Sequence, residues 1–243
     1  MDCGAACIAA GIELLEAMGQ SMPVSGEHHC AKPVTRVHHP IFARAYERFS
    51  HVAEAKGSSE YRDRLLAGLQ GRVIEVGAGN GLNFSHYPTT VTEVVGVEPE
   101  TFLRARAEDA ARSASVRITI LDGTADALPV ADAEFDAGVA SLVLCSVPDQ
   151  AAALAELRRV IRPGGELRFF EHVVSKRPGP ARLQRIADRT IRPFLSGGCH
   201  AARDTLTAIQ QAGFIIEHSE RFSFRPNPID VTSPHILGTA RRS

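Results

Sequence analysis

The chain has 243 residues, of which 44% are hydrophobic and 23% charged, and its formal net charge at pH 7 is -1. This length and composition predict a globular protein with one sizeable α/β core and short extensions. The near-neutral charge excludes a surface built for the phosphate backbone, so we expect no nucleic-acid partner.

The cysteines and the N-terminal region predict a reducing compartment. An odd, scattered set of five cysteines does not form a disulfide framework, which favours the cytoplasm. The set is Cys3, Cys7, Cys30, Cys145 and Cys199. Residues 5–19 are apolar but carry Glu13 and Glu16, so they are too short and too charged for a membrane span or a secretion signal.

Residues 1–40 are predicted to be an N-terminal extension, and residues 41–243 the main domain. The extension begins with a short helix and continues as a segment rich in Pro, Gly, Ser and His. Its cysteines and histidines match no zinc spacing closely; we expect no metal, and a structural zinc site is the alternative. This metal-like group consists of Cys3, Cys7, His28, His29 and Cys30. Residues 41–70 follow as helices, broken near Gly57, that cap a pocket.

After Gly71 the pattern alternates between strands and helices, which predicts a parallel sheet covered on both faces. The predicted strands are 73–76, 94–97, 116–121, 135–141 and 167–174. Helices are expected to begin at 82–87, to span 100–113, and to follow an N-cap at Asp149 until the RPGG stretch at 162–165. A helix at 202–212 and strands at 214–218 and 235–239 complete the pattern, with these two strands antiparallel.

The glycine-rich stretch after the first strand points to a bound nucleoside. Gly77, Gly79 and Gly81 allow a ligand to approach the backbone closely. Leu82 stands where the dinucleotide-binding motif has its third glycine, which argues against a nicotinamide or flavin dinucleotide as the ligand. Glu75 disfavours a phosphate and favours a cationic ligand, and Glu98 at the end of the second strand is placed to accept two ribose hydroxyls.

These motifs resemble the class I S-adenosyl-L-methionine-dependent methyltransferases, and in particular the methyltransferase type 11 domain. EVGAGNG at 75–81 matches their E/D-x-G-x-G-x-G motif, and VVGVEP, LDGTADALP, FDAGVASLVLCSV and RVIRPGGELRF follow in the family's order. The resemblance covers roughly residue 41 to the end. It implies a Rossmann-like, doubly wound, seven-stranded sheet that is mostly parallel with the last strand antiparallel, and S-adenosyl-L-methionine as the cofactor. The implied cofactor residues are Glu75, Gly77, Ala78, Gly79, Gly81, Asn83, Phe84, Glu98, Pro99, Thr124, Ala125, Asp126, Ser141, Leu142 and Cys145.

Two details of that assignment depart from the family pattern or extend it. Many relatives have an Asp that contacts the adenine amino group where this chain has Thr124, so Asp126 or the backbone at Ala125 is expected to substitute. Tyr87 joins Asn83 and Phe84 as a candidate wall of the cofactor pocket.

The second half of the chain resembles the methyltransferase-like 7 group, which methylates small alkyl and drug-like thiols. LVLCSVPDQ, LRRVIRPGGELRFFEHV, GGCHAARDT and SPHILG carry this likeness. Animal members of the group begin with a hydrophobic membrane anchor, which we do not expect here. The resemblance therefore implies S-methylation of a small thiol. Methylation of oxygen or carbon in a natural product or quinone, and a non-catalytic regulatory protein that binds the cofactor, stay open.

Several side chains are candidates to act on the acceptor. His172 follows the fifth strand, where an imidazole that titrates near neutral pH can serve as a base. His200 and His235 are further candidates for a catalytic role. Cys199 is a candidate to orient or sense a thiol, whereas Cys145 is expected to pack against the methionine part of the cofactor.

Overall fold

The computed structural model describes residues 40–190, 198–225 and 232–243. Within the chain, Val34–Ser243 forms one compact unit. The predicted extension at 1–40, with its candidate zinc ligands, lies outside the described residues except for Pro40. The boundary at residue 40 therefore stays a prediction.

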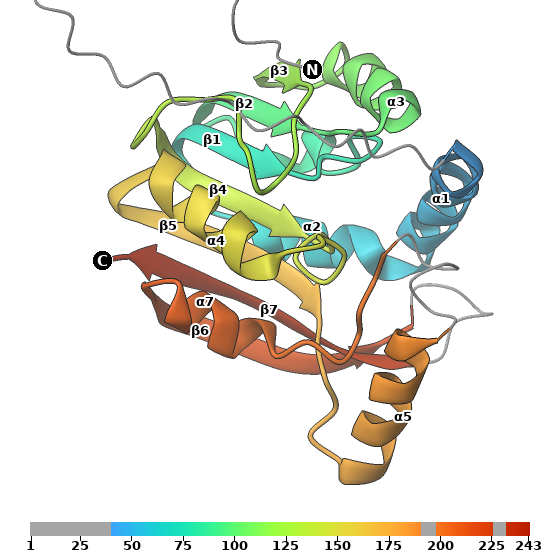
Figure 1. Cartoon of the computed structure of the whole chain (residues 1–243). Coiled ribbons are helices and arrows are strands. Elements are labelled where there is room, and N and C mark those ends of the chain that lie inside the picture. The colour runs from blue at the N-terminus through green and yellow to red at the C-terminus, as the bar shows by residue number, and fades with distance from the viewer. Residues whose placement is uncertain (1–39, 191–197, 226–231) are drawn as a thin grey trace, which may run out of the picture. The chain divides into compact units, whose positions relative to one another are not determined.

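One mixed sheet forms the centre of the described chain, as predicted (Figure 1). Its seven strands lie in the order β3-β2-β1-β4-β5-β7-β6. The strands are β1 (Gly71–Val76), β2 (Val91–Val97), β3 (Arg117–Leu121), β4 (Phe135–Ser141), β5 (Ile161–His172), β6 (Phe214–Phe224) and β7 (Ser233–Arg242). Strands β1 to β5 pair in parallel, and β7 is antiparallel to both β5 and β6, which confirms the expected reversal at the last strand.

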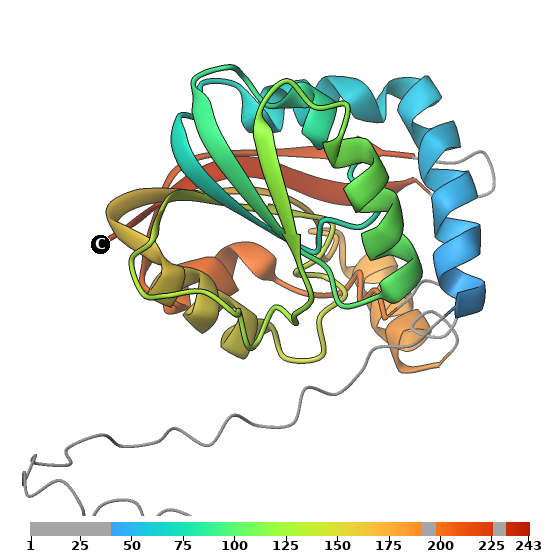
Figure 2. The ribbon, with the colours of Figure 1, turned by 90° about the horizontal axis from the view of Figure 1, so that it is seen from above.

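Helices cover both faces of the sheet, as Figure 2 shows. The helical elements are α1 (Pro40–Ala53), η1 (Glu54–Ser58), α2 (Ser59–Leu66), η2 (Phe84–His86), α3 (Thr101–Ala111), α4 (Gln150–Val160), α5 (Pro178–Arg189) and α7 (Thr205–Gln211). Leu154 and Leu157 of α4 share one core with Ile209 of α7, whereas Leu65 and Leu66 of α2 lie in a second core. Along β1 the side chains alternate between these two cores, which is how a strand buried on both sides folds.

Local sequence signals account for several element ends. The predicted break near Gly57 is confirmed, because Gly57 has φ 106 between α1 and α2. The predicted N-cap is confirmed as well: the Asp149 side chain accepts a hydrogen bond from the Ala152 N–H at 3.0 Å.

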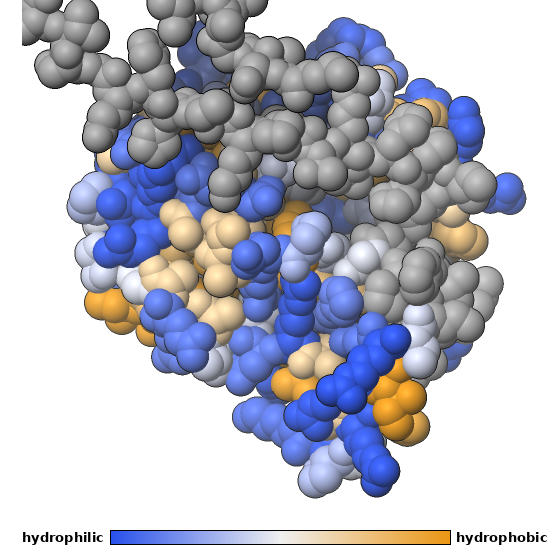
Figure 3. All heavy atoms as spheres, in the orientation of Figure 1, coloured by the Kyte–Doolittle hydropathy of each residue, from blue (hydrophilic) through white to orange (hydrophobic). Residues whose placement is uncertain are grey.

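Two predicted elements differ from the structure, and one helix was not predicted. The helix expected at 82–87 is a single 3-10 turn, η2, because Tyr87 is already extended before Pro88. Helix α4 ends at Val160, before the RPGG stretch that was expected to stop it, and this stretch is an irregularity within β5, which begins at Ile161. Helix α5 was not predicted, and its Leu183 and Ile186 are mostly exposed. Figure 3 shows this mixture of apolar and charged surface at the lower end of the view, where α5 lies.

The topology sets where a ligand can bind. Because β1, β2, β4 and β5 run in parallel, their carboxyl ends meet at one edge of the sheet. The glycine-rich stretch follows β1, Glu98 follows β2, Ser141 ends β4 and His172 ends β5. In sheets of this kind the ligand site lies at that edge, where the strand order reverses. No helix in the described part of the chain is long and apolar enough to cross a bilayer.

Candidate functional site

The glycine turn after β1 packs against the loop that follows β4. Gly77, Gly79 and Gly81 all have positive φ, of 66, 57 and 81°. A Cβ added at Gly77 would lie 2.9 Å from Val143 Cβ and closer still to one of the valine's methyl groups. The turn therefore needs glycine at position 77 both for its backbone conformation and for contact with the loop that follows β4.

Glu98 ties the end of β2 to this turn. Its carboxylate is buried and accepts hydrogen bonds from the Gly79 N–H at 2.8 Å and the Glu100 N–H at 3.0 Å. Burial raises the pKa of Glu98, and the two backbone donors partly offset that effect. A carboxylate has about four lone-pair directions, so each oxygen can still accept one more hydrogen bond from a ligand hydroxyl.

Arg104, which was not predicted as a site residue, stabilises the segment that follows β2. Its guanidinium donates to the Glu98 carbonyl at 2.8 Å and to the carboxylate of Asp122 at 3.0 Å. It also donates to the carbonyl of Pro99, a predicted cofactor residue, at 3.1 Å. Arg104 thus links α3 to the ends of β2 and β3.

Glu75 is buried inside the turn. Its two oxygens accept from Asn83 Nδ2 at 2.8 Å and from the Tyr87 hydroxyl at 2.7 Å, and Arg62 donates to Asn83 Oδ1 at 2.7 Å. Burial raises the pKa of Glu75 to about 7. In this structure Glu75, Asn83 and Tyr87 bond to one another and fix the shape of the turn, while Phe84 is buried in the second core.

Helix α1 covers the turn from outside the sheet. A Cβ added at Gly79 would lie 3.5 Å from the ring of Tyr46, so the tyrosine lies directly over that glycine. Asn80 Nδ2 donates to Glu47 Oε2 at 2.8 Å and to Ser50 Oγ at 3.0 Å. Helix α1 therefore lies beside the glycine turn. Its role as a cap over a bound ligand stays a prediction.

The segment predicted to flank adenine follows β3. The Ala127 N–H donates to the Thr124 carbonyl at 3.1 Å, which closes a tight turn around Ala125 and Asp126. Asp126 is exposed and Thr124 is half-buried. This leaves backbone and side-chain polar groups of the turn at the same edge as Glu98, and nothing in the contacts singles out Asp126.

The loop after β4 carries the next predicted residues. Ser141 Oγ is buried and has no hydrogen-bond partner among the described residues. Leu142 has φ 59, an unusual conformation for leucine that its N–H stabilises by donating to the Phe170 carbonyl at 2.7 Å. The N–H groups of Val143, Leu144 and Cys145 then all donate to the Glu171 carboxylate, at 3.0, 2.8 and 3.1 Å.

Glu171 is therefore the anchor of this loop. It lies at the end of β5, is fully buried, and burial raises its pKa to about 7. No sequence signal indicates this role, because the three donors are backbone groups of a distant loop.

Two of the candidate acceptor-site residues, His172 and Cys199, come together with Cys145, which was expected to pack against the cofactor, and a third candidate, His235, packs against His172. His172 Nδ1 lies 3.8 Å from Cys145 Sγ and 3.7 Å from Cys199 Sγ. The buried His235 ring lies 4.1 Å from the His172 ring, centroid to centroid, and its Nδ1 is 2.9 Å from the Ser233 carbonyl oxygen. His200 is next to Cys199 in the chain, where its N–H donates to the Cys145 carbonyl at 2.8 Å.

An aromatic cluster extends from this group. The rings of Tyr61 and Phe222 are stacked at 4.4 Å, and Phe224 meets Tyr61 edge-on at 4.9 Å. Phe222 in turn stacks on His235 at 5.9 Å. Because Tyr61, Phe222 and Phe224 are only half-buried, they offer apolar surface beside the histidine pair.

Comparisons with known proteins identify the family and support the fold. Residues 74–169 match the family model described as "Methyltransferase domain". The chain is 34% identical over 222 residues to the thiol S-methyltransferase TMT1B of Homo sapiens, covering 87% of this chain and 88% of that protein. It is 32% identical over 140 residues to the ubiquinone/menaquinone biosynthesis C-methyltransferase UbiE of Syntrophotalea carbinolica, covering 56% and 58%. In fold it matches an S-adenosylmethionine-dependent methyltransferase of Mesorhizobium loti with a TM-score of 0.56 at 22% identity, covering 74% and 95%.

Proposed function

Since this chain belongs to the family of S-adenosyl-L-methionine-dependent methyltransferases that includes the thiol S-methyltransferases, we propose that it methylates the sulfur of a small, largely apolar thiol. The observation that carries the proposal is the acceptor side of the sheet edge. There, a histidine faces two cysteine sulfurs, and half-buried aromatic rings continue from it.

The residues at the carboxyl edge fit the family's cofactor. Gly77, Gly79 and Gly81 give the turn a positive-φ backbone that side chains rarely adopt, and Glu98 retains lone pairs for two ribose hydroxyls. The buried Ser141 hydroxyl lacks a protein partner among the described residues, which favours a polar ligand group at the end of β4. The cofactor, when bound, supplies a methyl group that is already activated by a positive sulfur. The chain has only to hold the donor, orient the acceptor and exclude water.

The two binding regions are connected by direct packing. Val143 contacts Gly77 of the cofactor turn, and Cys145 lies two residues further along the same loop. Glu171 fixes that loop through three backbone donors, and His172 follows Glu171 directly. Cys145 and His172, on the acceptor side, are therefore positioned by the same loop that contacts the cofactor turn.

A thiol suits this site better than an alcohol. A thiol ionises near pH 8.5, so it needs only modest help to present its thiolate, whereas an aliphatic alcohol needs a strong base. We assign His172 to the acceptor sulfur, because it is the half-buried histidine that faces the two cysteines. His235 orients the His172 ring by packing against it, with the ring centroids 4.1 Å apart. Roles for His200 and for the remaining predicted cofactor residues are proposed from their position at this edge of the sheet.

The rival activity is methylation of oxygen or carbon. The 32% identity to the C-methyltransferase UbiE over 56% of this chain supports this alternative. An assay with labelled S-adenosyl-L-methionine and a panel of alkyl thiols, phenols and quinols separates the two. Thioether formation from the thiols alone is the expected result, and turnover restricted to phenols or quinols contradicts the proposal.

We further propose a small-molecule acceptor rather than nucleic acid, and a cytoplasmic location. The net charge of -1 supports the first, and the two buried thiols 3.7 Å apart support a reducing compartment. The proposed organisation is an extension at 1–40 followed by the methyltransferase domain at 41–243, with α1 and α2 as its cap. Stabilisation by S-adenosylhomocysteine without transfer to any acceptor would instead indicate a regulatory protein.

A further inference from the structure

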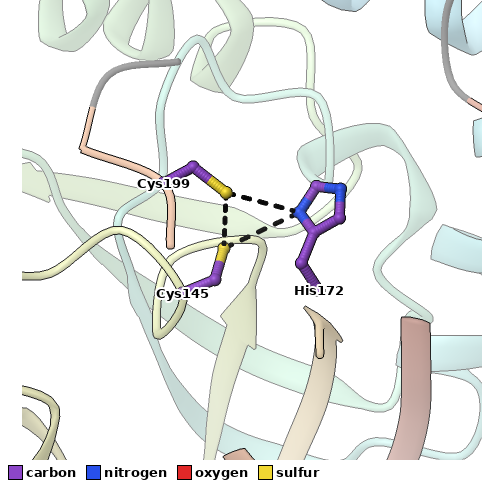
Figure 4. A group of neighbouring side chains, drawn as sticks. All are labelled: Cys145, His172 and Cys199. Carbon is purple, nitrogen blue, oxygen red and sulfur yellow. Dashed lines mark hydrogen bonds between the residues drawn. The ribbon is translucent and has the colours of Figure 1, made fainter. Parts of the chain in front are cut away.

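Two cysteines and a histidine from separate segments form a small triangle of donor atoms. Cys145 comes from the loop after β4, His172 ends β5, and Cys199 precedes α7. The two sulfurs are 3.7 Å apart, and His172 Nδ1 is 3.8 and 3.7 Å from them. Figure 4 shows all three side chains pointing inward, with the imidazole Nδ1 directed at both sulfurs.

The dimensions of this triangle are those of a tetrahedral zinc site. With Zn–S near 2.3 Å and Zn–N near 2.0–2.1 Å, tetrahedral ligands lie about 3.8 Å apart for two sulfurs and about 3.5 Å for sulfur and nitrogen. The three observed separations agree with these values within about 0.3 Å. A zinc ion seated over this face would therefore require little movement of its ligands.

The backbone holds the two cysteines together independently of their sulfurs. The His200 N–H donates to the Cys145 carbonyl at 2.8 Å, and Arg203 donates to the carbonyls of Leu144 and Val147 at 2.6 and 2.7 Å. Asp188 of α5 accepts from the N–H groups that follow at 201 and 202. The ligand geometry is thus built by contacts around the triangle, as expected for a preorganised site.

The two sulfurs also favour a cation. Cys145 Sγ and Cys199 Sγ lie 3.7 Å apart, and two thiolates at this separation repel each other unless a positive charge compensates them. A divalent ion supplies that charge, because coordinated cysteine binds as the thiolate.

We propose that Cys145, His172 and Cys199 bind one Zn²⁺ whose fourth position is open to the acceptor, so that the thiol to be methylated binds there as its thiolate. Among the described residues, no further His, Cys, Asp or Glu joins this group of donors. Sites with three protein ligands and one open position are typical of catalytic rather than structural zinc. His172 is half-buried, and the aromatic cluster lies beside this group through His235, where an apolar thiol can approach.

The inference rests on the proposed function and specifies how the acceptor is activated. On binding, the acceptor loses its S–H proton to solvent, and its sulfur forms a bond to the metal. That sulfur then forms a bond to the methyl carbon while the bond from this carbon to the donor sulfonium breaks. The electron pair of the broken bond stays on the donor sulfur. The acceptor leaves as a neutral thioether, which binds zinc more weakly than a thiolate does.

The direct test is metal binding by the reduced full-length chain. We expect about one Zn²⁺ per chain after equilibrium dialysis against micromolar zinc, and Co²⁺ substitution should give thiolate-to-cobalt and tetrahedral d–d absorption bands. Cys145→Ala and Cys199→Ala should each lose the metal and the bands. The matched control replaces Cys3, Cys7 and Cys30 together by serine in the full-length chain, and it should keep both. Circular dichroism of each variant checks that it is folded.

A second measurement on the cobalt form links the metal to the acceptor. Adding an alkyl thiol should shift the visible bands, whereas the corresponding alcohol should not. The site is refuted if the reduced chain binds no zinc, if both cysteine variants keep it, or if the thiol leaves the bands unchanged. If thiols are methylated under those conditions, the proposed function stands and only the site fails. A cobalt site that responds to thiols, in a chain that methylates no thiol, refutes the proposed function instead.

Discussion

Replacing Gly77 by alanine tests the contact that connects the cofactor turn to the acceptor loop. At φ 66, alanine loses about 1–2 kcal/mol relative to glycine because its Cβ crowds the backbone. The added Cβ would also lie 2.9 Å from Val143 Cβ, and overpacking of this kind costs about 1–3 kcal/mol more. Gly77→Ala should therefore lower the free energy of unfolding by about 2–5 kcal/mol.

The matched control for this change is Gly164→Ala. Gly164 has a similar φ of 77, and a Cβ added there meets nothing within 4 Å, so only the backbone cost of about 1–2 kcal/mol applies. Urea denaturation of both variants gives the difference, expected to be about 1–3 kcal/mol, which belongs to the Val143 contact. Adding Val143→Ala to Gly77→Ala should recover part of it. Equal destabilisation of the two glycine variants would refute the packing argument.

Three further changes address the cofactor, the pH dependence and the acceptor. Glu98→Ala should weaken S-adenosylhomocysteine binding by about 10-fold or more, since hydrogen bonds to a charged group contribute about 1.5–3 kcal/mol; unchanged affinity in calorimetry would contradict the ribose role. Glu75 has its pKa raised from 4.5 to about 7, so the folded state holds a proton that the unfolded state loses. As the pH rises from 4.5 to about 7, the free energy of unfolding of the wild type should fall relative to that of Glu75→Gln by up to about 3 kcal/mol. If the two free energies of unfolding have the same pH dependence, the Glu75 carboxyl is not neutral in the folded state. Tyr61→Ala should raise KM for apolar thiols several-fold with little change in cofactor affinity, and an unchanged KM would remove the aromatic cluster from the acceptor site.

Much of the fold follows from local patterns. The alternation of apolar strands with helices fixes a parallel sheet, and Gly57 and Asp149 mark element ends through their own backbone and side chain. Helix α5 was missed although Pro178 stands at its start and Leu183 and Ile186 stand at helical spacing. The turn η2 was predicted as the start of a helix from the alternation of strands and helices, but the residue before Pro88 is extended and the turn goes no further.

The candidate site was predicted unevenly for a physical reason. Residues in one contiguous motif, such as Gly77 and Gly79, can be read from spacing alone. The role of Glu171 could not, because it depends on three backbone donors from another strand's loop. The same holds for Cys145 and Cys199, which are 54 residues apart and meet only through the pairing of β4 with β5 and the loop before α7. We expected no metal from the sequence, and the juxtaposition of these residues with His172 is what motivates a zinc site.

The most direct test of the account is the position of the transferred methyl group on an acceptor that offers both nucleophiles. A mercaptophenol carries a thiol and a phenol on one ring and is incubated with the full-length chain and methyl-labelled S-adenosyl-L-methionine. The same incubation without the protein measures the uncatalysed background. We predict an enzyme-dependent thioether as the product identified by mass spectrometry and NMR, and enzyme-dependent methylation at oxygen or carbon would contradict the central claim.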